Sequence, residues 1–334
     1  MAVEPFSDEQ ARALVNLEQR YQVWMAAEQA VHALPYDLRR KEVAGRSYLY
    51  EIEGRSGNGK SLGPWSPENA ARFENYHRHK REMKARRDAS RPTLDEAGRL
   101  SRALRVPMLA DAAGPILREC DRRRLLEGSL LVVGTNAMSA YAVEAGGFIR
   151  EAPDETQDFD LAWAGKAPAD GEAPTIWAML KAVDPTFTVN MERTFQARNA
   201  RAYEVEILVA PSRAGTMHRL DKPTPAPLPE QEWLLNGRPI DRVVVCRDAS
   251  PARIVAPDPR WFALQKLWMA RKAERNPLKR PKDLKQGLAL LDAVRVAMPQ
   301  YPLDAAFEAE LPDDLAGLYR DWRAKAPSVG TPSW

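Results

Sequence analysis

The feature that most constrains the fold of this 334-residue chain is a short apolar strand that ends on a glycine and leads into a helix. Residues 130–133 (LLVV) have the apolar character of a buried strand, and residues 135–146 have the small side chains of a packed helix. Between them, Gly134 lets the main chain approach a ligand closely, and the helix N-terminus presents amide donors to an anion. This pattern predicts a phosphate-binding turn.

Two later segments alternate acidic and apolar residues. In DFDLAW, the period of a strand puts Asp158 and Asp160 on one face and the apolar side chains on the other. In YEVEILV, the same period puts Glu204 and Glu206 together on one face. Carboxylates held this close repel one another unless a cation lies between them, and oxygen ligands suit Mg²⁺ or Mn²⁺. The sequence therefore predicts a site that gathers acids from two strands.

A second phosphate-binding pattern competes with the first. Residues 54–61 (GRSGNGKS) match the P-loop consensus letter for letter. A P-loop requires a helix to begin at its Lys-Ser end, whereas Pro64 and Pro67 follow Lys60 within seven residues and disrupt such a helix. We interpret residues 47–65 as a β-hairpin whose turn is rich in glycine, and a P-loop NTPase stays the weaker alternative.

The rest of the chain is mainly helical by its periodicity. We expect a helix up to about residue 43, opened by a capping box of Ser7 and Gln10, and a basic helix from Pro67 that ends before Pro92. Helices are expected again over residues 93–126 and after Pro259.

Two stretches are strongly basic. Residues 72–91 hold eight Lys or Arg against three acids, and residues 251–290 hold ten against three. Such stretches are commonly solvated faces, but with Tyr76, Trp261 and Trp268 they could also line a path for nucleic acid. An RNA or DNA acceptor is therefore one hypothesis, and a protein or a small molecule is the other.

Composition sets the outer limits. The chain is 44% apolar with a formal net charge of +3, which excludes a wholly disordered protein. The N-terminus lacks the apolar core of a signal peptide, and no apolar run is long enough to cross a membrane. Cys120 and Cys246 are too few for a disulfide framework, so we expect a cytoplasmic protein without a membrane partner.

The segments VVGTNAMSAYAVEAG, TQDFDLAW and YEVEILVAP together resemble the nucleotidyltransferase superfamily of DNA polymerase beta, and in particular its stand-alone bacterial family. Residues 261–291 are distantly similar to the Lys and Lys-Asp segments of AbiEii-type toxins of toxin–antitoxin systems. The resemblance implies metal-dependent transfer of a nucleotidyl group from an NTP such as ATP to an acceptor hydroxyl, with release of pyrophosphate. The two basic stretches favour RNA as the acceptor.

The resemblance also implies roles for single residues. Asp158 and Asp160 would bind both metals, and Glu206 would complete the metal site, with Glu204 as the alternative. The nucleotide would be held by Gly134, Thr135, Asn136, Lys266 and Lys282. For Lys266 the other interpretation is a lysine at the rim of a helix, with only its stem packed on the core.

Two residues depart from the family pattern, because Thr135 stands where serine is commoner and Glu206 stands where aspartate is usual. A weakly active or inactive nucleotide-binding module of a defence or toxin–antitoxin system is therefore the alternative function. The predicted fold class is α+β. We divide it into an N-terminal helix and hairpin region (residues 1–92), a mixed-sheet nucleotidyltransferase core (93–255) and a C-terminal helical domain (256–334).

Overall fold

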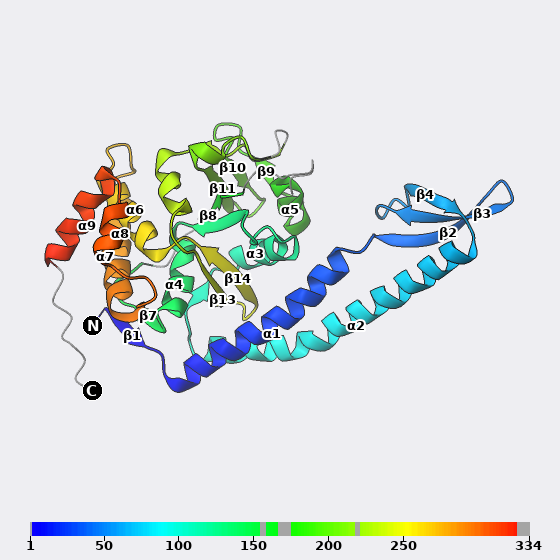
Figure 1. Ribbon diagram of the computed structural model, residues 1–334, viewed down its shortest axis with the longest axis horizontal. Helices are drawn as coiled ribbons and strands as arrows, with labels where there is room; N and C mark the ends of the chain where they lie inside the picture. The colour runs from blue at the N-terminus through cyan, green and yellow to red at the C-terminus, as the bar shows by residue number, and fades with distance from the viewer. Residues whose placement is uncertain (1, 154–157, 166–174, 218–220, 326–334) are drawn as a thin grey trace.

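The structure is a computed structural model that describes residues 2–153, 158–165, 175–217 and 221–325. Figure 1 shows a body of mixed α and β structure from which a long two-helix arm extends, with a small sheet at the far end of the arm. The α+β class is confirmed. No helix in the described part of the chain has the length and apolar composition that a membrane span requires.

The main sheet of the body is mixed. Strand β8 (Asp158–Trp163) pairs in parallel with β11 (Glu204–Val209). β6 (Leu130–Val133) and β10 (Gln196–Arg198) flank this pair in antiparallel orientation. A sixth strand, β12 (Ala226–Pro227), pairs in parallel with the end of β11. In spatial order the other strands are β6 (Leu130–Val133), β8 (Asp158–Trp163), β11 (Glu204–Val209), β10 (Gln196–Arg198) and β9 (Thr188–Val189).

Two smaller sheets complete the body. β13 (Ile240–Cys246) lies between β14 (Pro251–Ala256) and β5 (Met108–Leu109), and the N-terminal strand β1 (Val3–Pro5) pairs with β7 (Gly147–Ile149). The hairpin of β13 and β14 was not predicted from the sequence. β14 contacts β6, so one continuous apolar core runs between the main sheet and the sheet of β14, β13 and β5.

The helices of the body pack around these sheets. They are α3 (Ala113–Arg122), α4 (Met138–Glu144), α5 (Ile176–Val183), α6 (Pro259–Arg271), α7 (Arg280–Ala297), α8 (Ala305–Glu310) and α9 (Asp313–Lys325), with short 3-10 helices at Thr135–Ala137, Pro211–Arg213 and Pro229–Leu235. α6 and α7 pack against each other, and Figure 1 shows the C-terminal helices together at one side of the body.

The arm consists of α1 (Asp8–His32) and α2 (Pro67–Ala103), which pack along each other. The predicted capping box is confirmed, because the Ser7 hydroxyl accepts from the Gln10 amide and the Gln10 side chain accepts from the Ser7 amide. The expected continuation of this helix to residue 43 is wrong. Residues 37–43 form β2 (Asp37–Val43), in which Leu38 is buried beneath the sheet at the tip.

The expected helix end at Pro92 is also wrong, because α2 runs through it to Ala103. Proline removes one backbone hydrogen bond, but packing against α1 and the body on both sides of Pro92 outweighs that cost. Leu94 and Ala97, just beyond the proline, are buried with Leu17 of α1. The division of the chain at residues 92 and 255 stays a prediction.

The P-loop match lies in the tip of the arm. Residues 54–58 form the turn between β3 (Arg46–Ile52) and β4 (Gly59–Pro64), and Lys60 is an exposed strand residue that pairs with Glu51 at 3.5 Å. The antiparallel sheet order is β2, β3, β4. No helix begins at Lys60, so the hairpin interpretation is confirmed and these residues lack the structure of a P-loop.

Candidate active site

The glycine turn after β6 places the main chain against an acidic side chain. Gly134 has φ of +70°, a conformation that favours glycine. A Cβ atom built on Gly134 would lie 2.1 Å from Oδ2 of Asp160. No other residue type could therefore occupy this position while Asp160 keeps its place.

The acids gather because β8 and β11 are neighbours in register. Asp158 lies beside Glu204, and Asp160 lies beside Glu206. In both strands the acids are half-buried while the residues between them are fully buried, as the alternation predicts. The structure thus brings four carboxylates onto one face of two adjacent strands.

Burial and neighbouring acids make the charged form of the acids on this face unfavourable, although several cations surround it. Burial, together with the charges of Asp158 and Glu206, raises the pKa of Asp160 to about 7, although Lys266 and Lys279 oppose the shift. Burial and the charge of Asp158 likewise raise the pKa of Glu206. The face is therefore prepared for an additional cation.

Glu204 and Glu206 differ in their partners on the next strand. Arg198 donates to Glu204 over 2.7 Å, and Gln196 donates to both glutamates, at 2.9 Å to Glu204 and 3.1 Å to Glu206. Among the residues that the structure describes, Glu206 makes no ion pair. Glu204 is thus bound directly by an arginine, whereas Lys279 and Arg193 act on Glu206 only through their charges.

Thr135 and Asn136 are buried and bind protein groups. The Asn136 amide donates to the backbone carbonyl of Asp158 over 3.0 Å, which fixes the start of β8 beside the glycine turn. The Thr135 hydroxyl accepts from the Gln286 amide over 3.3 Å, which connects the turn to α7. Both side chains therefore position the elements that carry the acids.

α7 contributes a polar stripe to the site. Lys279, Lys282, Asp283 and Gln286 recur at helical spacing and so share one face. Lys279 binds Oδ2 of Asp158 over 2.8 Å. Burial and the charge of Lys266 lower the pKa of Lys282, as expected for a lysine among other cations.

Lys266 is buried, so its interpretation as a rim lysine is wrong. Its ammonium group lies 2.9 Å from Asp283, which Arg275 also binds over 2.8 Å. Burial raises the pKa of Asp283, but these two cations outweigh it and the net shift is downward. Lys266 affects Asp160 only through its charge.

Comparison with known families agrees with this geometry. A family model described as nucleotidyltransferase matches residues 111–312, which include the glycine turn, both acidic strands and the whole of α7. The chain belongs to this nucleotidyltransferase family. No curated protein and no solved structure matches it. The matched region begins after α2, so the arm lies outside the part that this nucleotidyltransferase shares with its family.

Three residues of this nucleotidyltransferase site were not among those chosen from the sequence, namely Lys279, Gln196 and Gln286. Lys279 and Gln286 could have been found from the sequence, because they lie three residues before and four residues after Lys282, which was chosen, and so share its helical face. Gln196 offered no such signal, since its role depends on the pairing of β10 with β11.

The carboxylates fit a divalent cation in their chemistry. Oxygen donors from Asp158, Asp160 and Glu206 are the ligands that Mg²⁺ prefers, and the raised pKa of Asp160 reflects charge that such an ion would neutralise. Within the described residues, no three Asp, Glu, His or Cys side chains are grouped closely enough to hold an ion as they stand. Asp158 instead binds Lys279, so metal binding requires this contact to be exchanged.

Proposed function

We propose that this nucleotidyltransferase moves a nucleotidyl group from an NTP to a hydroxyl of RNA in a reaction that depends on Mg²⁺ or Mn²⁺. The observation that carries the proposal is the juxtaposition of Asp160 with both the glycine turn and Glu206. A phosphate chain bound at the turn would thereby lie beside the acids. The raised pKa values of Asp160 and Glu206, which burial and neighbouring acids cause, support the dependence on a cation.

Asp158, Asp160 and Glu206 would hold the metal ions, which when bound polarise the α-phosphate and neutralise departing pyrophosphate. The acceptor hydroxyl attacks the α-phosphorus, one P–O bond forms, and the bond to pyrophosphate breaks. Glu206, which is half-buried and is bound directly by no Lys or Arg among the described residues, is the third acid in this proposal, whereas Arg198 holds Glu204 in place.

The nucleotide would lie between the glycine turn and α7. Lys279 neutralises Asp158 in the structure, and we assign it to the NTP phosphates once Asp158 binds metal. Lys282, on the same face, is assigned the same role, whereas Lys266 and Asn136 position the site from within the protein. ATP is one NTP among those to be tested.

The proposal also includes a location and a biological role. The buried free thiols of Cys120 and Cys246 agree with a cytoplasmic location. The similarity of residues 261–291 to AbiEii-type toxins suggests a role in a toxin–antitoxin or defence system. For such a role, either transfer or nucleotide binding alone would serve.

The test is incorporation from each α-labelled NTP into total RNA, with DNA and protein as parallel acceptors, in Mg²⁺, Mn²⁺ or EDTA. We expect label in RNA only when a divalent cation is present. The double variant Asp158→Asn/Asp160→Asn should lose at least about 100-fold in rate while remaining folded, because it removes most of the charge that holds the cation.

The control is Glu204→Gln compared with Glu206→Gln. Glu204→Gln should keep most of the activity, whereas Glu206→Gln should lose it. The reverse result would assign the third acid to Glu204. If calorimetry shows that the wild type binds NTP but no acceptor takes up label, the chain is a binding module and the proposal fails.

A further inference from the structure

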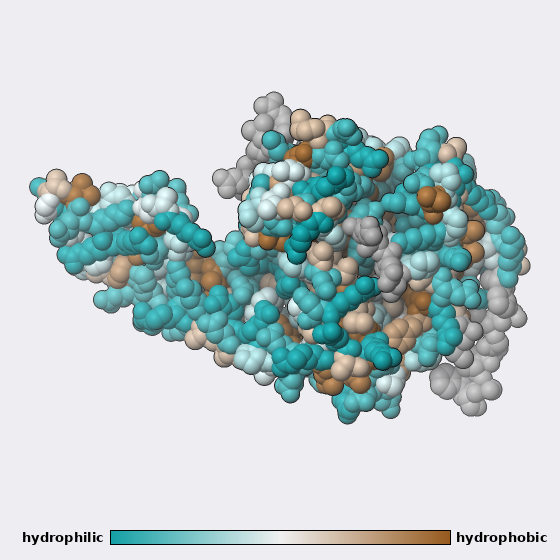
Figure 2. All heavy atoms as spheres, turned by 180° about the vertical axis from the view of Figure 1, so that it is seen from behind, coloured by the Kyte–Doolittle hydropathy of each residue, from teal (hydrophilic) through white to brown (hydrophobic). Residues whose placement is uncertain are grey.

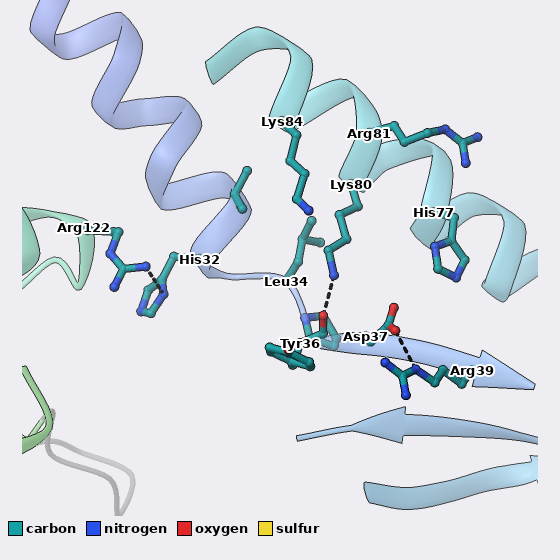
Figure 3. A pocket seen from close by; sticks show the side chains of 12 residues that line it. His32, Leu34, Tyr36, Asp37, Arg39, His77, Lys80, Arg81, Lys84 and Arg122 are labelled. Carbon is teal, nitrogen blue, oxygen red and sulfur yellow. Dashed lines mark hydrogen bonds and ion pairs between the residues drawn. The ribbon is translucent and has the colours of Figure 1, made fainter. Parts of the chain in front are cut away.

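A cationic cleft lies where the arm leaves the body. It has a volume of about 690 Å³ and is bounded by the end of α1, the start of β2, the middle of α2 and the end of α3. Figure 3 shows Lys80 and Lys84 extending from α2 toward Leu34 and Tyr36, with His32 and Arg122 facing them from the other side. We call it the arm cleft.

Positive charge is concentrated in the arm cleft. Five Lys or Arg side chains and one Asp line it, whereas the whole chain has a net charge of only +3. Asp37 is bound to Arg39 over 2.8 Å, and Arg122 is bound to Glu119. Among the described residues, Arg81 and Lys84 make no ion pair, so their charges are available to a ligand.

Lys80 and Lys84 of α2 point into this cleft, whereas Arg81 lies at its edge and extends away from Tyr36 (Figure 3). His77, Lys80, Arg81 and Lys84 follow the three- and four-residue steps of one helical face. Burial and the positive charges of Arg122 and Arg123 lower the pKa of His32 on the opposite wall. Both walls of the arm cleft therefore present positive potential.

Aromatic groups accompany the charges. Tyr36 is 48% exposed, and Lys80 lies 6.0 Å from its ring centroid. Lys80 also donates to the Tyr36 carbonyl and, over 2.6 Å, to the Tyr76 hydroxyl, which fixes its ammonium group between the two rings. A flat exposed ring beside cations is typical of surfaces that bind single-stranded nucleic acid.

We propose that the arm cleft binds single-stranded RNA, and that it holds the acceptor of the proposed transfer reaction, on which this second role rests. Lys and Arg contact phosphates, and Tyr36 stacks on a base. The volume of about 690 Å³ lies within the range of protein pockets for small molecules and leaves room for a nucleotide. Figure 2 shows that hydrophilic residues cover most of the arm and that the surface is notched between arm and body.

The test compares two double charge reversals on the same helix. Arg81→Glu/Lys84→Glu changes two exposed cations of the arm cleft. Arg72→Glu/Arg86→Glu changes two exposed cations on the opposite side of α2, since nine residues separate Arg72 from Arg81 and correspond to two and a half turns. None of the four makes a hydrogen bond or ion pair within the described residues, so both variants are expected to fold.

Binding is measured by fluorescence anisotropy with a labelled single-stranded RNA of about 20 nucleotides, without NTP or metal. We expect the cleft variant to bind about 10- to 100-fold more weakly than the wild type, with a salt slope smaller by about two. The control variant should stay within about threefold. Tyr36→Ala should weaken binding while leaving the salt slope unchanged.

Several outcomes would overturn the assignment. These are equal losses in the two variants, no binding by the wild type, equally tight binding of DNA of the same sequence, and displacement of RNA by polyglutamate at equal charge. The first and the last would show that charge alone explains the binding. The other two would show that the cleft has no site for RNA or no preference for RNA over DNA.

Transfer kinetics separate this inference from the proposed function. The cleft variant should raise the KM for RNA while leaving the KM for NTP unchanged. Asp158→Asn/Asp160→Asn should bind RNA as the wild type does. If no transfer occurs but RNA binding still depends on Arg81 and Lys84, the proposed function fails and the RNA site stands. If transfer occurs and the cleft variant keeps the wild-type KM for RNA, only the cleft assignment fails.

Discussion

The charged carboxylate of Asp160 is buried beside other acids, which lowers the free energy of unfolding of the protein. Replacing it by the neutral Asp160→Asn should stabilise the metal-free protein by roughly 1–2 kcal/mol at pH 8, because it removes the cost of burying a charge and the repulsion from Asp158 and Glu206. Urea denaturation checks this. Asp158→Asn should gain less, since it also loses the ion pair with Lys279. Added Mg²⁺ should stabilise the wild type and leave Asp160→Asn unchanged.

The same change predicts a pH dependence. An unfolded Asp ionises near pH 4, whereas the pKa of Asp160 is raised to about 7 in the folded chain. The folded state binds this proton more tightly, so the wild type loses stability as pH rises from about 4 to about 7. The difference between Asp160→Asn and the wild type should therefore grow over that interval and level off above it. A constant difference from pH 4 to 8 would contradict this account.

Gly134 allows a direct test of the close approach to Asp160. Gly134→Ala should destabilise the protein by about 2–4 kcal/mol, because the new methyl group overlaps the Asp160 carboxylate and the φ of +70° is strained. Gly146→Ala is the matched control, since Gly146 has a similar φ of +65° and no atoms where the methyl group would lie. Thermal unfolding measures both, and equal losses would mean that backbone strain alone accounts for Gly134.

At the scale of elements, α6 and α7 are joined by the buried ion pair of Lys266 and Asp283. Asp283→Asn should cost about 3 kcal/mol, because it leaves a lysine side chain that is only 8% exposed without its anion. Lys266→Met/Asp283→Leu should recover most of this loss. Asp321→Asn, which breaks the exposed pair of Arg271 with Asp321, should cost under about 0.5 kcal/mol. Denaturant midpoints compare the three variants.

Local patterns predicted elements well where one face decides the structure. Alternation placed Asp158 with Asp160 and Glu204 with Glu206, because a strand with one buried face admits no other register. Local patterns failed to predict elements whose structure depends on packing against residues far away in the sequence. Pro92 reads as a helix end, yet contacts with α1 carry α2 through it, and β2 depends on pairing with β3.

At the scale of the whole molecule, contacts between residues far apart in the sequence could not be predicted from the sequence alone. The parallel pairing of β8 with β11 sets Asp160 beside Glu206, and strand order is a tertiary property that no local window contains. Lys279 lies 121 residues from Asp158 in sequence, so its role depends on how the C-terminal helices pack against the sheet. The general site could be predicted, but its internal pairing could not.

The arm leaves the body after β1 and returns at β5, and both of these strands pair within the body. The family match begins only after this excursion. Along the chain, the tip is bounded by the end of α1 and the start of α2, which pack along each other. A different tip could therefore be inserted between these helices without moving the glycine turn or the strands that carry the acids.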